Sequence, residues 1–559
     1  MSLASVVTDQ SEYYEAGDLG GCPMAKSVIV NLDALIPRED FLATDQGADA
    51  GGTGKSEISR TDLLKAELFQ STLRKPDFQR ETAAWSPEAI CRFLETFVDD
   101  ELIPSVICWQ SPSRLTFVID GAHRLSAVMA WLYDDYGDGE ESVRFYANNI
   151  PEEQKKIADT TRAMVNASIG SYKEYMAATQ HPKTNPKLES RVRSLAHSKI
   201  PLLWVKGSDS QKAERAFLTI NQSAVPIDPT EFTILNSRSL PNAIAARAIV
   251  RNAAGYKYWD KFSPEGIVEI EKIAKSIYSA LYKPPLETPL RSLELPIAGM
   301  GYGTQTLPLV FDMVNIANKF TIVDPSKKSK QSRLAISHDK PNEDATRSAI
   351  GKTKRLVDRF TGTDPSSLGL HPAVYFYASN GRHQPTSVLA LALLLSELDD
   401  QTLFIKFTSV RKQYEDFLMN HKMFVNQLTV KHGSMVKGFR PLKDYYLFVL
   451  ERFFAGKNEI QIEGELKGHD KYQTLVKERP VLSKKAKKLS QGTKDVHFLE
   501  NALKDVSECQ LCSARIDYKS IHFDHIQERS KGGLGTSANT QMVHPFCDSA
   551  YKPYLQNRQ

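Results

Sequence analysis

The sequence has few cysteines and no long apolar run. Six cysteines among 559 residues are too few, and too widely spaced, for the disulfide framework of a small secreted protein. No apolar run approaches the roughly 20 residues that a membrane-spanning helix needs. The first residues also lack the basic and then apolar layout of a secretory signal. We therefore expect a cytoplasmic protein with no membrane partner.

The net charge is also small, at +4 for the whole chain, so charge alone indicates no partner. Its distribution is more informative, because two short stretches, 327–333 and 483–494, are strongly basic. Basic runs suit the phosphates of nucleic acids. Each run taken alone is explained equally well as a solvated linker.

The chain is long enough to need several cores, since a single core stops growing at about 250–300 residues. From about 74 to 136 short apolar runs alternate with helical patterns, whereas 236–454 is mainly helical. We predict a multidomain α+β protein in four parts: an α/β domain at 1–245, a helical domain at 246–455, a basic linker at 456–500 and a small C-terminal domain at 501–559.

Two pairs of soft metal ligands stand near the C-terminus. Cys509 and Cys512 form a C-x-x-C pair, and His544 and Cys547 form an H-x-x-C pair. Two such pairs around a polar segment are typical of a closed tetrahedral zinc site. A segment this small buries little apolar surface, so a structural Zn²⁺ would stabilise it.

The segment between these pairs carries groups suited to hydrolysis. Asp524 offers a hard carboxylate oxygen of the kind that Mg²⁺ or Mn²⁺ binds. His525 can act as a general base towards water near neutral pH. Gly532 and Gly533 permit a tight loop, and Asn539 could orient His525 or ligate the metal through its amide oxygen. The alternative is an Asp-His pair on the protein surface without a catalytic role.

These motifs together resemble those of the HNH nucleases, which have a ββα-metal fold. The matching positions are Cys509, Cys512, Asp524, His525, Gly532, Gly533, Asn539, His544 and Cys547. The resemblance implies that His525 activates water and that Asn539 supports the loop or the base. It also implies that Asp524 and Asp548 hold the catalytic metal. Asp548 stands where the family usually has His or Asn, and the Lys that typically follows is shifted to Lys552.

A second group of polar residues lies in the N-terminal α/β region. A strand is predicted to end at Asp120, Gly121 makes the turn, and a helix begins near His123. Helix N-termini attract anions, and Arg80 and Arg124 could clamp a phosphate through paired hydrogen bonds. The alternative is that Asp120 caps the helix while the arginines make structural ion pairs.

The order of these motifs resembles that of ParB/sulfiredoxin-like domains in modification-dependent restriction proteins. Gln79-Arg80, followed by Trp85 and then by Asp120-Gly121-Ala122-His123-Arg124, is similar to the nucleotide-hydrolysing N-terminal domain of GmrSD/SspE-type systems. It is also similar to the Asp-Gly-Gln-His-Arg (DGQHR) proteins of DNA phosphorothioation, with Ala122 in place of Gln. The resemblance implies a ParB/Srx-like domain that binds an NTP. Its nucleotide-binding residues would be Gln79, Arg80, Asp120, Gly121, His123 and Arg124.

Taken together, the motifs favour a metal-dependent HNH DNA endonuclease that is regulated by an N-terminal nucleotide-binding or nucleotide-hydrolysing domain. Such a protein would act in antiphage restriction, with DNA, modified phage DNA included, as its partner. One alternative is a non-catalytic regulatory protein that binds DNA or nucleotide and keeps a degenerate HNH zinc module. Another is an RNA-cleaving HNH effector. The sequence leaves open the nucleotide, the DNA modification and whether the chain forms a homo-oligomer.

Overall fold

The structure is a computed structural model, and the account below concerns the residues that it describes. These are 28–41, 55–65, 67–79, 81–180, 186–207, 210–223, 230, 233–234, 237–322, 340–398, 400–475 and 489–557. Of the predicted features, Arg80, the basic run at 327–333 and the first half of the run at 483–494 lie outside them.

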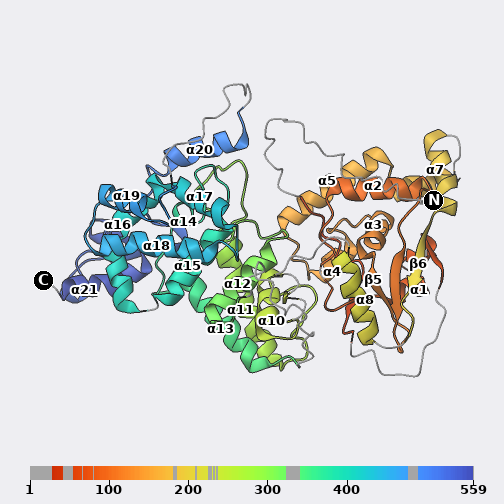
Figure 1. The fold of residues 1–559 in the computed structure, drawn as a ribbon, viewed down its shortest axis with the longest axis horizontal. Coiled ribbons are helices and arrows are strands. Elements are labelled where there is room, and N and C mark those ends of the chain that lie inside the picture. The colour runs from red at the N-terminus through yellow and green to blue at the C-terminus, as the bar shows by residue number, and fades with distance from the viewer. Residues whose placement is uncertain are drawn as a thin grey trace, which may run out of the picture.

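The N-terminal part is built on a mixed six-stranded sheet with the strand order β1-β3-β5-β4-β6-β2 (Figure 1). The strands are β1 (Arg38–Glu39), β2 (Glu57–Ser59), β3 (Leu73–Pro76), β4 (Val106–Gln110), β5 (Thr116–Asp120) and β6 (Lys199–Trp204). Strand β5 is parallel to β3 and antiparallel to β4, and β4 is parallel to β6. Strands β4 and β5 lie inside the sheet, and most of their residues are apolar and buried.

Both faces of this sheet are covered, because successive side chains of a strand point to opposite faces. Val118 belongs to the larger core, with α2 (Pro87–Val98), α3 (Ala122–Tyr133) and α5 (Glu152–Ser168). Phe117 belongs to a smaller aromatic core against α8 (Ser210–Ser223). Helix α2 begins at a side-chain cap, since the Ser86 hydroxyl accepts a hydrogen bond from the Ala89 N–H at 3.3 Å.

The middle of the chain is helical. Its longer helices are α10 (Pro241–Val250), α11 (Pro264–Tyr282), α12 (Thr306–Asn318), α13 (Glu343–Phe360), α15 (Pro385–Glu397), α16 (Gln401–Asn420), α17 (Lys422–His432) and α18 (Phe439–Phe454). Helix α15 is apolar on nearly all sides and packs between α12 and α18. Among the described helices, none is long and apolar enough to cross a membrane.

Parts of the predicted linker at 456–500 form helices. Helices α19 (Glu459–Gly468) and α20 (Gln491–Ala502) bury Ile462, Leu466 and Leu499 in the same core as the helical middle. These apolar residues are widely spaced among charged ones, so the sequence pattern did not reveal the helices. Residues 476–488, which include the first half of the basic run at 483–494, lie outside the described residues.

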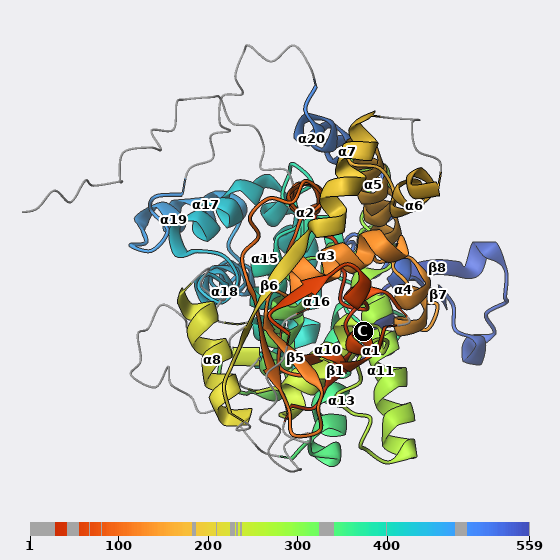
Figure 2. The ribbon, with the colours of Figure 1, turned by 90° about the vertical axis from the view of Figure 1, so that its right-hand side faces the viewer.

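The C-terminal part contains a two-stranded antiparallel sheet, β7 (His522–His525) with β8 (Thr540–Val543). A π-helical turn, η5 (Cys547–Tyr551), and the short helix α21 (Lys552–Gln556) follow. Phe546 and Ala550 are buried in the core of the helical middle, and the Phe546 N–H donates to the Ser367 carbonyl at 2.9 Å. The C-terminal part therefore packs firmly on the helices. Figure 2 shows β7 and β8 at one side of the molecule. The predicted mixed α/β, multidomain organisation is confirmed.

Candidate functional site

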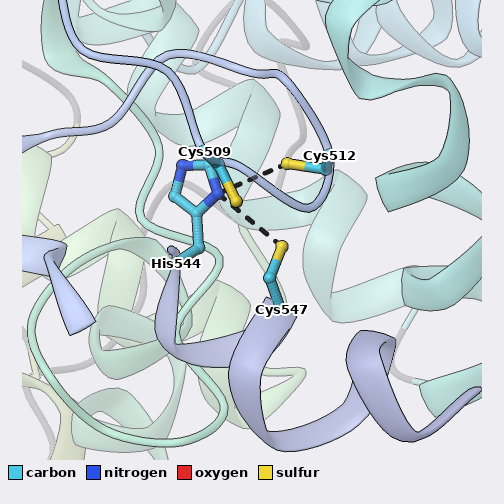
Figure 3. Close-up of side chains that lie close together, drawn as sticks. All are labelled: Cys509, Cys512, His544 and Cys547. Atoms are coloured by element: carbon cyan, nitrogen blue, oxygen red, sulfur yellow. Dashed lines mark hydrogen bonds between the residues drawn. The ribbon is translucent and has the colours of Figure 1, made fainter. Parts of the chain in front are cut away.

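The four predicted soft ligands come together in one buried cluster (Figure 3). One ligand atom from each of Cys509, Cys512, His544 and Cys547 lies within 4.8 Å of the others. Nδ1 of His544 is 3.5 Å from Sγ of Cys512 and 3.7 Å from Sγ of Cys547. Cys509, His544 and Cys547 are at most 1% exposed.

The thiols of this cluster share hydrogen bonds that place one negative charge among them. Hydrogen bonds from the other two thiols lower the pKa of Cys509 far below its ordinary value, which favours its thiolate, whereas the hydrogen bond with Cys509 raises the pKa of Cys512 and of Cys547. Burial lowers the pKa of His544, which favours the neutral imidazole. Nε2 of His544 lies 3.0 Å from the Arg515 carbonyl, so it carries the proton and Nδ1 presents its lone pair to the sulfurs. Three cysteines and one histidine in this arrangement fit a structural Zn²⁺.

The polar side chains of strand β7 lie on two opposite faces of the ribbon. Because side chains alternate along a strand, His522 and Asp524 share one face, whereas Phe523 and His525 share the other. The carboxylate of Asp524 accepts a hydrogen bond from the Gln541 amide at 2.8 Å. His525 is partly exposed at the end of the strand, where water can reach its ring.

Asp524 also forms an ion pair with Lys552. The Lys552 ammonium lies 2.9 Å and 2.7 Å from the two carboxylate oxygens and donates to the His525 carbonyl at 2.7 Å. The π-helical turn Cys547–Tyr551 precedes Lys552. A π-turn holds one more residue than an α-turn, so this turn accounts for the shifted lysine noted in the sequence.

Asp548 lies on the same side of the ribbon but contacts a different partner. Its Oδ2 is 3.3 Å from Nδ1 of His522, whose Nε2 is 3.1 Å from the Thr363 carbonyl. Asp524 and Asp548 are thus placed on one polar face, defined by His522, Asp524, Asp548 and Lys552. Within the described chain, this face holds no set of three ligand atoms within 4.8 Å. The sequence analysis missed His522, although its position two residues before Asp524 indicates a shared face.

Asn539 fixes the glycine loop rather than the His525 ring. Its Oδ1 accepts from the Gln527 N–H at 2.8 Å, and its Nδ2 donates to the carbonyls of Gln527 at 3.1 Å and Leu534 at 2.8 Å. A side chain at Gly533 would place Cβ 1.9 Å from the Gln527 carbonyl oxygen. Gly532 has a φ of +83°, which glycine adopts readily.

The N-terminal motif forms a tight strand-to-helix turn. Strand β5 ends at Asp120, Gly121 has a φ of +96°, and α3 begins at Ala122. One Arg124 nitrogen lies 2.5 Å from Oδ2 of Asp120 and 3.2 Å from the Ser105 carbonyl. The structure therefore contains the ion pair of the alternative interpretation.

The other members of the predicted nucleotide set are more dispersed. The His123 ring stacks on Trp85, with the ring centres 5.6 Å apart. Gln79 follows β3, and its carbonyl accepts a hydrogen bond from Arg38. Its side chain lines a cavity beside Glu81. Arg80 lies outside the described residues. The turn brings Asp120, Gly121 and Arg124 together, while Gln79 faces the cavity.

Two segments of the chain match known families. Residues 61–239 match the N-terminal domain of the GmrSD restriction endonuclease, and residues 509–553 match the HNH endonuclease family. No curated protein and no solved structure matches the chain. The first match contains the Asp120 turn and the second contains the ribbon and the cysteine cluster, so the resemblances to GmrSD and to the HNH nucleases are confirmed. The chain therefore carries a segment similar to the N-terminal domain of the GmrSD restriction endonuclease and, further along, a segment similar to HNH endonucleases.

Proposed function

We propose that the chain is a metal-dependent DNA endonuclease that is controlled by its N-terminal domain and acts against foreign DNA, modified phage DNA included. The observation that carries the proposal is the polar face of the HNH domain, where Asp524, Asp548 and His522 lie beside a zinc-type cluster. The HNH match supports phosphodiester hydrolysis, and the GmrSD match supports the restriction role.

In this proposal Asp524 and Asp548 hold the catalytic cation. Their carboxylate oxygens are hard donors of the kind that Mg²⁺ and Mn²⁺ prefer. When bound, the cation supplies positive charge that stabilises the leaving oxygen of the cleaved bond. The Lys552 ammonium balances part of the Asp524 charge before the cation binds, because it lies within 2.9 Å of both oxygens.

His525 is the proposed general base. The partly exposed imidazole accepts the proton of the attacking water, which is a common role of histidine in hydrolysis. Asn539 supports this end of the strand, since its carbonyl accepts from the Ile526 N–H at 2.9 Å. The Cys509, Cys512, His544 and Cys547 cluster takes a structural Zn²⁺ that fixes the ribbon to the C-terminal helix.

We extend the proposal to an NTP site in the N-terminal domain, formed by Gln79, Arg80, Asp120, Gly121, His123 and Arg124. The turn at the N-terminus of α3 and the nearby Arg124 support it. Replacing Arg124 by Ala is expected to abolish NTP hydrolysis. Turnover equal to that of the parent would remove this site.

The deciding experiment incubates the full chain with modified and unmodified phage DNA, with and without each NTP, in Mg²⁺ or Mn²⁺, and follows strand cleavage on a gel. His525→Ala is expected to slow cleavage at least about 100-fold. His497→Ala is the matched control, because His497 is exposed on α20, away from β7.

Other outcomes select the alternatives. Equal cleavage by the parent and His525→Ala would show that His525 is not the base. DNA binding without cleavage under any condition would favour the regulatory protein with a degenerate HNH module. Cleavage of RNA but not of DNA would favour the RNA-cleaving effector.

A further inference from the structure

A cavity of about 480 Å³ lies where the N-terminal domain meets the helical middle. Gln79, Tyr146 and Gln154 line it from the N-terminal side, and Arg247, Tyr258 and Tyr302 line it from the helical side. In Figure 1, α10 and α12 lie on the side of the helical middle that faces the N-terminal domain. The cavity is large enough for a small organic ligand.

Arg247 is a buried cation that forms no ion pair with a carboxylate of the described residues, although the charge of Asp77 acts on it from a longer distance. It is 4% exposed, and its guanidinium carbon lies 4.1 Å from the centre of the Tyr258 ring. Its described hydrogen bond goes to the Arg238 carbonyl, at 3.3 Å. Among the described residues, no carboxylate oxygen comes within 4.0 Å of its nitrogens.

The neighbouring arginines, unlike Arg247, each form an ion pair with a carboxylate. Arg251 pairs with Glu81 at 2.8 Å, and Arg238 pairs with Glu214 at 3.0 Å. Burying a charge without a counter-ion is costly, and evolution usually pairs such groups. Burial accordingly lowers the pKa of Arg247. The guanidinium has five N–H donors in a planar fork that matches a carboxylate or a phosphate, and most of them are unused.

Two further polar atoms on the cavity wall lack partners. The Tyr302 hydroxyl and Oε1 of Gln79 are buried and have no hydrogen-bond partner among the described residues. Buried polar atoms are nearly always hydrogen-bonded, so both atoms indicate a missing partner. Together with Arg247 they offer an anion-binding donor, a hydroxyl and an acceptor on the walls of one cavity. The rings of Tyr146, Tyr258 and Tyr278 provide flat apolar surface beside them.

We propose that this cavity binds a small organic anion with one carboxylate or phosphate group, held by Arg247, and a flat polar ring that lies among the tyrosines. The single positive charge of the Arg247 guanidinium would be balanced by the single anionic group of the ligand. The ligand contacts both domains, so its binding stabilises the junction between them. The proposal goes beyond the nuclease function. The cavity shares Gln79 with the proposed NTP site, but it uses neither the Asp120 turn nor the HNH site.

The test measures thermal unfolding of the full chain with four probes: AMP, benzoate, inorganic phosphate and uncharged adenosine, each at millimolar concentration. AMP or benzoate is expected to raise Tm by about 5 °C. Adenosine is expected to have a much smaller effect. Preference for AMP over benzoate indicates a phosphate ligand, and the reverse indicates a carboxylate. If no probe raises Tm, or if adenosine matches AMP, the proposal is wrong.

Two variants separate ligand binding from folding. Arg247→Met is expected to weaken the binding of the active probe about 30-fold, while the Tm without a probe stays equal to that of the parent or rises, because an unpaired buried charge has been removed. Tyr302→Phe is expected to weaken binding without loss of stability. A lowered Tm in Arg247→Met together with unchanged probe binding in Tyr302→Phe would overturn the proposal and make Arg247 a structural residue.

Discussion

At the residue scale, the pKa of Asp517 shows how tertiary packing changes the ionisation of a side chain. It is 1% exposed between the HNH domain and the helical middle. The Thr361 hydroxyl donates to its Oδ2 at 3.2 Å, whereas Oδ1 has no partner among the described residues. Burial raises the pKa of Asp517 to about 6. Asp517 therefore stays protonated to a higher pH in the folded protein than an exposed aspartate does.

The raised pKa gives a stability prediction with a definite sign. Between about pH 4 and 6 the folded state binds more protons than the unfolded state, so this group makes stability fall as pH rises through that window. Asp517→Asn is expected to remove this dependence and to raise the free energy of unfolding at pH 7 by up to about 3 kcal/mol. Urea unfolding at pH 4.5 and pH 7 checks both effects, with Asp505→Asn at an exposed position as the control.

At the element scale, the glycine loop of the HNH domain has little room for a side chain. A Cβ at Gly533 would meet the Gln527 carbonyl oxygen at 1.9 Å, whereas one at Gly535 would meet nothing within 4 Å. Gly533→Ala is therefore expected to displace the loop and Asn539, and to lower DNA cleavage at least about tenfold. Gly535→Ala is the matched control and should cleave like the parent. Equal rates for the two variants would mean that the loop does not position the site.

The zinc-type cluster is a second element whose removal has a predicted result. We expect one Zn²⁺ per chain by elemental analysis and its loss in Cys547→Ser, because Cys547 is one of four mutually close ligands. Loss of the metal should unfold the ribbon and lower Tm by several degrees. Cys91→Ala, outside the cluster, should keep its zinc. Full zinc content in Cys547→Ser would exclude the cluster as the metal site.

At the scale of the whole molecule, the cores divide the chain into two parts. The core of the helical middle runs without a break into Phe546 and Ala550 of the HNH domain. The N-terminal domain has separate cores on the two faces of its sheet. Contacts between the parts include the ion pair of Arg251 with Glu81 and a small separate apolar cluster of Tyr146, Ile150 and Ala254. The HNH domain is therefore coupled to the helices more tightly than to the N-terminal domain.

This division predicts two thermal transitions in calorimetry of the full chain. A zinc chelator is expected to lower the transition of the helical and HNH part and to leave that of the N-terminal domain nearly unchanged, since the zinc ligands pack on the helical core. A single transition whose Tm shifts as a whole would mean that the interface between the N-terminal domain and the helical middle couples all parts of the molecule.

The sequence by itself determined the features that depend on short spacing. The two ligand pairs around Cys509 and His544, the Ser86 cap of α2 and the turn at Gly121 each involve residues a few positions apart, and local geometry limits where such side chains can point. The same local character made both domain resemblances recognisable from short motifs.

Only the tertiary structure decided which distant groups meet. The contact of Lys552 with Asp524 depends on a π-helical turn, and that of His522 with Asp548 joins residues 26 positions apart. Arg247 is unpaired only because the folded chain brings no described carboxylate to it. The apolar residues of α19 and α20 are too sparse to predict burial until the core that receives them is formed. Pairing, burial and pKa are properties of the three-dimensional surroundings, which one-dimensional spacing does not specify.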